Sequence, residues 1–131
     1  MTTADCTVVP FMHGLAAYRV NVAGESFYQT SFDELCGEKT IEGVRIEVTA
    51  RLELQDDNPY DKHAVRVTIK GYQVGHLSRE DARAFRRLVR YGSLAEHEAF
   101  ECHGIICGGW DRGEGNIAHF GVRLDLKIDE N

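Results

Sequence analysis

The chain has 131 residues, of which 43% are apolar and 27% are charged, with 13 glycines and only 2 prolines. This length fits one domain, and the composition excludes a collagen, a coiled coil and a wholly disordered chain. The formal net charge of −6 argues against a nucleic-acid binder, because proteins bind phosphates through Lys and Arg.

The basic residues, however, are concentrated in one part of the chain. Residues 60–90 contain eight Lys or Arg against three acidic residues, whereas the rest contains seven against 18. Since local charge decides where an anion docks, we expect any phosphate contact to lie in this segment.

The N-terminal residues 1–16 show no hydrophobic period, and we expect an N-terminal arm there, followed by a domain over residues 17–131. The longest apolar run near the N-terminus, Val8 to Met12, is interrupted by Pro10, and no basic region precedes it. We therefore expect no membrane partner and a cytoplasmic location, or a nuclear one in a eukaryote. The four cysteines lack CxxC spacing, which favours reduced thiols.

Alternation of apolar and polar residues predicts several strands. The clearest is residues 45–54, and the same period of two recurs at residues 18–22, 65–69, 100–104 and 120–128. Lys70-Gly71 can form a tight hairpin. Four glycines within residues 108–115 predict a mobile loop with Trp110 at its tip.

Residues 78–91 predict one amphipathic helix. Ser78 can cap its first turn, and acidic residues follow where the helix dipole favours negative charge. The apolar residues Ala82, Phe85, Leu88 and Val89 share one side. The opposite side carries an arginine stripe, which is either a solvated face or, given its purity in an acidic protein, a functional one. The stripe consists of Arg79, Arg83, Arg86 and Arg90.

A turn is predicted at Asn58-Pro59-Tyr60-Asp61, because Pro presets φ and Asn and Asp bond nearby backbone amides. This turn, the Gln-Val-Gly-His-Leu-Ser-Arg-Glu run at residues 73–80, and Phe-Tyr at residues 27–28 together resemble a HIRAN domain over roughly residues 18–128. The resemblance implies a mainly β fold: a small OB-like barrel of about six strands with one main amphipathic helix and room for a second short helix.

The resemblance also implies a function, since HIRAN domains are accessory modules of DNA-damage-tolerance helicases that capture the 3′ end of single-stranded DNA. Tyr60 would stack on the terminal base, Asp61 would accept a hydrogen bond from the terminal 3′ hydroxyl, and Asn58 would hold the turn. His76 and Arg79 would contact phosphates. Further residues are assigned as aromatic walls of the pocket, namely Phe27, Tyr28 and Trp110, and as phosphate guides, namely Arg83, Arg86 and Arg90.

We therefore expect a DNA-binding module without enzymatic activity or cofactor, acting in DNA repair or replication-fork processing with a helicase or nuclease on a separate chain. No phosphate-binding loop, nucleophile elbow or HExxH motif is present. Two alternatives remain. The net acidity, and Ser26 where related DNA-binding domains have arginine, favour a protein-interaction module that kept the fold. A metal-dependent enzyme would need a zinc site built from Cys102, His103, Cys107 and His119, although strand alternation places the two cysteines on opposite faces.

Overall fold

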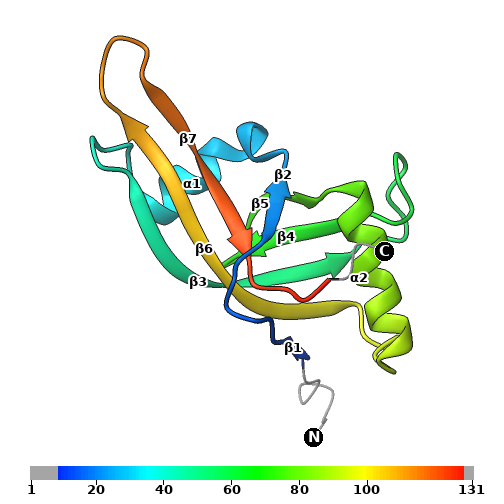
Figure 1. Ribbon diagram of the computed structural model, residues 1–131. Coiled ribbons are helices and arrows are strands. Elements are labelled where there is room, and N and C mark those ends of the chain that lie inside the picture. The colour runs from blue at the N-terminus through cyan, green and yellow to red at the C-terminus, as the bar shows by residue number, and fades with distance from the viewer. Residues whose placement is uncertain (1–8, 129–131) are drawn as a thin grey trace, which may run out of the picture.

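The computed structural model describes residues 9–128, and its centre is a closed β-barrel of six strands (Figure 1). Around the barrel the order is β6-β3-β4-β5-β2-β7, and β7 pairs with β6 to close the ring. The strands are β2 (Val20–Ala23), β3 (Val44–Leu54), β4 (Val65–Ile69), β5 (Tyr72–Leu77), β6 (Ala99–Asp111) and β7 (Ile117–Leu124). The predicted mainly β, OB-like barrel is confirmed.

The predicted strands are all present, with differences at their ends. β2 begins only at Val20, because Tyr18 has a φ of 49°, which is incompatible with an extended strand. β7 ends at Leu124 rather than at residue 128, although Leu126 beyond it is still buried. Lys70 and Gly71 both have positive φ, as expected for the tight hairpin between β4 and β5.

The prediction of a mobile loop over residues 108–115 is wrong for its first half. β6 continues to Asp111, and Trp110 pairs with Ala118 of β7. Gly109 is required here for a different reason: its φ is +70°, and a Cβ atom would lie 2.1 Å from the ring of Phe120. Gly109 thus leaves room for the ring of Phe120 on the paired strand, and the loop between β6 and β7 is limited to residues 112–116.

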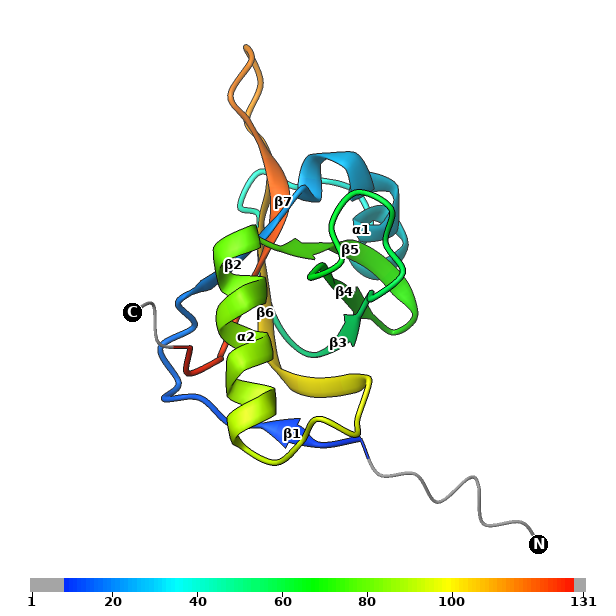
Figure 2. The same ribbon diagram turned by 90° about the vertical axis from the view of Figure 1, so that its right-hand side faces the viewer.

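The predicted helix is α2 (Arg79–Tyr91), and the hydroxyl of Ser78 caps it by accepting a hydrogen bond from the Asp81 amide at 3.1 Å. A 3-10 helix, η2 (Glu25–Tyr28), leads into a second short helix, α1 (Gln29–Cys36). Figure 2 shows α2 lying along the barrel, well apart from α1. Leu88 is 37% exposed, so it lies at the margin of the apolar face of α2.

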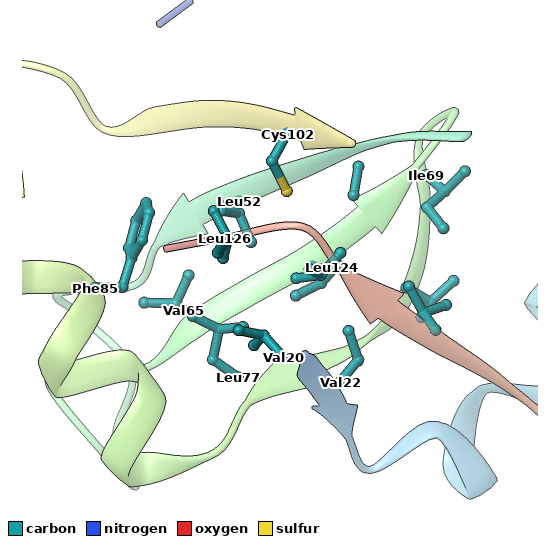
Figure 3. Close-up of a cluster of buried hydrophobic side chains, with 14 of the residues drawn as sticks. Val20, Val22, Leu52, Val65, Ile69, Leu77, Phe85, Cys102, Leu124 and Leu126 are labelled. Atoms are coloured by element: carbon teal, nitrogen blue, oxygen red, sulfur yellow. The ribbon is translucent and has the colours of Figure 1, made fainter. Parts of the chain in front are cut away.

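The core fills the barrel and extends beneath the helices. Figure 3 shows side chains from every barrel strand and from α2 converging on this cluster, including Leu52, Val65, Leu124 and Phe85. The ring of Phe85 packs edge-on against Phe100 of β6, with centroids 5.3 Å apart. Burial of such aromatic and branched side chains supplies the main folding free energy and fixes α2 on the barrel.

The N-terminal segment adds one short strand outside the ring. β1 (Phe11–Met12) pairs in parallel with Glu101 and Cys102 of β6. Residues 1–8 of the predicted arm lie outside the described residues, and the boundary at residue 17 stays a prediction. No helix within residues 9–128 has the length and apolar content needed to cross a membrane.

The described cysteines are Cys36, Cys102 and Cys107, and all three are free thiols. Cys102 lies in the core, where burial raises the pKa of its thiol to about 12. Within the described part of the chain, no three His, Cys, Asp or Glu side chains gather as metal ligands.

Candidate nucleic-acid interface

The centre of the candidate site is the turn that joins β3 to β4, residues 55–64. The carboxamide oxygen of Asn58 accepts hydrogen bonds from the amides of Tyr60 at 2.8 Å and Asp61 at 3.1 Å. The Asn58 amide in turn donates to the carbonyl of Gln55 at 3.1 Å. Asn58 therefore stabilises the turn, because its side-chain oxygen accepts the hydrogen bonds that a backbone carbonyl would otherwise accept. The sequence predicts this role for Asn before Pro.

The turn presents Tyr60 to solvent. Tyr60 is 89% exposed, which is unusual for an aromatic residue. No other described residue forms a hydrogen bond with its hydroxyl or stacks on its ring. The ring is thus free to act as a stacking platform.

Beside Tyr60, Asp61 is held in its ionised form. One of its oxygens, Oδ1, accepts a hydrogen bond from the His63 amide at 2.9 Å, and Oδ2 lies 3.9 Å from Nε of Arg79. The His63 bond and then the positive charges of Arg79, His63 and Arg83 hold the pKa of Asp61 below its usual value. The carboxylate is therefore a hydrogen-bond acceptor at neutral pH.

His76 on β5 connects the turn to the barrel. Its Nε2 lies 3.1 Å from Oε1 of Gln55, which also accepts from Nδ2 of Asn58 at 3.3 Å. Because an amide oxygen only accepts, the proton of the neutral imidazole is on Nε2. Burial and then the charge of Arg66 lower the pKa of His76 below 6.5, so the ring is neutral at pH 7. Gln55 joins these two predicted residues, and nothing in the sequence pattern singled it out.

The aromatic pair at residues 27–28 lies against the same strand. The Tyr28 hydroxyl accepts a hydrogen bond from Gln73 of β5 at 3.0 Å, and the Tyr28 and His76 rings are 6.5 Å apart. The neighbouring Phe27 points to solvent and is 85% exposed. The structure therefore brings Tyr28 to His76 and leaves Phe27 as a second exposed ring in η2.

Two residues that flank this pair fix η2 on β7. Oε2 of Glu25 accepts a hydrogen bond from the Val122 amide at 2.7 Å. The side chain of Gln29 bonds both the amide and the carbonyl of Phe120, at 3.0 and 3.1 Å. The position of the Phe-Tyr pair thus depends on contacts far away in sequence, which no local pattern reveals.

The arginine stripe on α2 divides into two kinds of residue. Arg86 has a side chain that is only 16% exposed, and it donates to the carbonyls of His63 and Ala64 and to the carboxylate of Asp56, at 2.7 to 3.0 Å. Arg86 therefore anchors the turn to α2, and its predicted role as a phosphate guide does not fit this arrangement. The exposed members are Arg79, Arg83 and Arg90.

Trp110 does not belong to this group of residues. The turn follows Leu54, the last residue of β3, which lies beside the start of β6. Trp110 lies near the other end of β3, because Gly108, two residues before it on β6, pairs with Val44. The ten steps along β3 correspond to about 33 Å at 3.3 Å per residue. Figure 1 shows the β6–β7 hairpin and the turn at opposite ends of the molecule. The prediction that Trp110 closes the pocket is therefore wrong. Its ring instead carries the guanidinium of Arg112 at 4.4 Å.

Comparison with known proteins identifies the fold family. A search of curated proteins finds no match. Among solved structures, the crystal structure of the HIRAN domain of human HLTF is similar, with 20% sequence identity and a TM-score of 0.33, over 68% of this chain and 79% of that one. The HIRAN domain family model matches residues 15–100, about two thirds of the chain, which includes the turn, His76 and Arg79. HIRAN domains are DNA-binding and are not themselves catalytic. This chain belongs to the HIRAN domain family.

Proposed function

We propose that this chain binds single-stranded DNA at its 3′ end, with the terminal nucleotide on the turn at residues 55–64. The observation that carries this proposal is the pairing of an almost fully exposed Tyr60 with an adjacent ionised Asp61 on one turn that the Asn58 side chain holds by hydrogen bonds. A stacked base gains about 1 to 3 kcal/mol on such a ring, whatever its identity.

The carboxylate of Asp61 supports an end rather than an internal segment. A carboxylate repels the phosphate that would follow any internal nucleotide, but it accepts a hydrogen bond from a free hydroxyl. The exposed Arg79 and Arg83 lie near enough to lower the pKa of Asp61, so positive charge stands beside the place where the last internal phosphate would be. Arg90 extends this positive surface along α2.

The test compares two labelled single strands that differ only at the terminus, one with a 3′ hydroxyl and one with a 3′ phosphate, by fluorescence anisotropy. Two like charges about 4 Å apart near a surface repel by about 1 to 4 kcal/mol, so the phosphate should weaken binding at least about fivefold. Equal affinity for the two strands would rule out the assigned role of Asp61.

Asp61→Asn is the informative variant, because the amide oxygen can still accept from His63 and preserve the turn. We expect this variant to lose most of the discrimination between the two ends. Asp57→Asn is the matched control, since Asp57 is an exposed carboxylate of the same turn that forms no ion pair within residues 9–128. If binding to this surface proved insensitive to salt, the alternative of a protein-interaction module would be favoured instead.

A further inference from the structure

The first half of β3 has an open edge. β6 pairs with β3 from Val44 to Glu53, but β4 pairs only with Arg51 to Leu54. Among residues 9–128, no other strand pairs with residues 44–50 on the β4 side. Such an edge presents unpaired N–H and C=O groups that can form a ladder with another strand.

The hydrogen bonds at the end of β3 identify the groups that face this edge. The Leu54 amide donates to Glu98, on the β6 side, and the next amide, that of Gln55, donates to Ala64, on the β4 side. Successive residues of a strand alternate in this respect. Arg45, Glu47 and Thr49 therefore direct their N–H and C=O groups toward the open edge.

There is space beside these groups. A cavity of about 420 Å³ is lined by residues from both faces of β3, by His103 and Ile106 of β6, and by Ile69 and Lys70 at the end of β4, so it reaches the open edge of β3. Ile46 on the inner face is 37% exposed, although Ala50 and Leu52 on the same face are fully buried. The lining includes Ile46, Val48, Glu47 and Thr49, together with Leu35 of α1 and Ile69 of β4.

We propose that a second copy of this chain pairs antiparallel with this edge, centred on Ile46. In such a pair, the residues of each copy that exchange hydrogen bonds must be those whose N–H and C=O groups point to the open edge, namely Arg45, Glu47 and Thr49. A register that sets Arg45 against Arg45, or Glu47 against Glu47, opposes like charges. Only the register centred on Ile46 sets each Arg45 opposite Glu47 of the other copy.

The same register also pairs apolar side chains with one another on the inner face of β3. It places Ile46 opposite Ile46 of the second copy and Val44 opposite Val48, so the apolar residues left exposed at the open edge cover one another. A two-fold axis relates the two copies, and the interface is closed and self-complementary. Charged residues on an edge strand otherwise serve to prevent pairing, and the experiment separates these two roles.

The test is sedimentation velocity on the full chain from about 5 to about 500 μM. For the wild type we expect the mass to rise from 14.7 kDa toward twice that value as concentration increases. Arg45→Glu opposes two glutamates at both ends of the pair, and Glu47→Arg opposes two arginines. Each should weaken association at least tenfold, and the double variant Arg45→Glu/Glu47→Arg should restore it.

Mixing the two single variants sharpens the test, because a heterodimer of Arg45→Glu with Glu47→Arg again pairs opposite charges. The matched control is Arg123→Glu on β7, an exposed strand arginine whose strand is paired on both sides by β6 and β2. This control should associate like the wild type. A wild type that stays monomeric at every concentration would overturn the proposal. So would folded single variants, checked by circular dichroism, whose mixture does not associate.

Discussion

Replacing Tyr60 by Ala separates a ligand contact from a packing residue. Tyr60 is 89% exposed, so about a tenth of its side chain is covered. A fully buried aromatic residue costs about 3 to 5 kcal/mol of folding stability when truncated to Ala, and a tenth of that is about 0.3 to 0.5 kcal/mol. The backbone hydrogen bond from residue 60 to Asn58 is kept in the variant.

The effect on DNA binding should be much larger than the effect on stability. Loss of one stacked base costs about 1 to 3 kcal/mol, which corresponds to a loss of affinity of about 5- to 150-fold. The free energy of unfolding is measured by urea denaturation, and affinity by anisotropy with a short single strand. Tyr60→Phe keeps the ring and should bind nearly as well as the wild type.

Tyr91→Ala is the matched control, because Tyr91 is also a strongly exposed tyrosine (78%) but lies at the far end of α2 from the turn. It should change neither quantity. A Tyr60→Ala variant that lost about 2 kcal/mol of stability or more, with its DNA affinity intact, would refute the stacking role.

Four further outcomes are expected. Arg86→Gln should lower the free energy of unfolding by about 1 to 3 kcal/mol, because partly buried bonds to the turn are lost, whereas Arg83→Gln should change it by less than about 0.5 kcal/mol; urea titrations compare the two. Replacing Arg83 and Arg90 together by Gln should flatten the slope of log affinity against log salt by about 1.4, if each contacts one phosphate of a single strand. Since burial lowers the pKa of His76 in the folded chain, its contribution to stability is fully present above pH 6.5 and is lost as the pH falls through 6.5 toward the folded value; His76→Gln should remove this dependence from the urea midpoints. Cys102 should resist thiol reagents in the folded protein and react only on unfolding, whereas the partly exposed Cys107 should react faster than Cys102. Mass spectrometry after brief labelling distinguishes the two.

Features that depend on local chemistry could be predicted from the sequence. The period of two over residues 45–54 identified β3, and Ser78 identified the start of α2. Asn58 before Pro59 identified the turn, because an Asn side chain that bonds amides two and three residues later needs no distant partner. These elements were correct to within a few residues.

Features that depend on distant partners could not be predicted. Arg83 and Arg86 occupy similar positions on the helical stripe, yet only Arg86 meets the carbonyls of the turn. The glycines around residue 109 predicted a loop, but Gly109 lies in a strand, where contact with the ring of Phe120 requires glycine. Trp110 was placed at the tip of that predicted loop, whereas it lies within β6. Gln55 was missed because its role depends on His76, which β5 brings beside it.

The bonds that hold the turn have a thermodynamic consequence. Asn58 fixes it from within, Gln55 and His76 attach it to the barrel, and Arg86 attaches it to α2. The unbound turn therefore has little conformational entropy left to lose. A ligand would associate with it as with a rigid surface, at a rate set by diffusion and charge, and with a heat-capacity change limited to the area in direct contact.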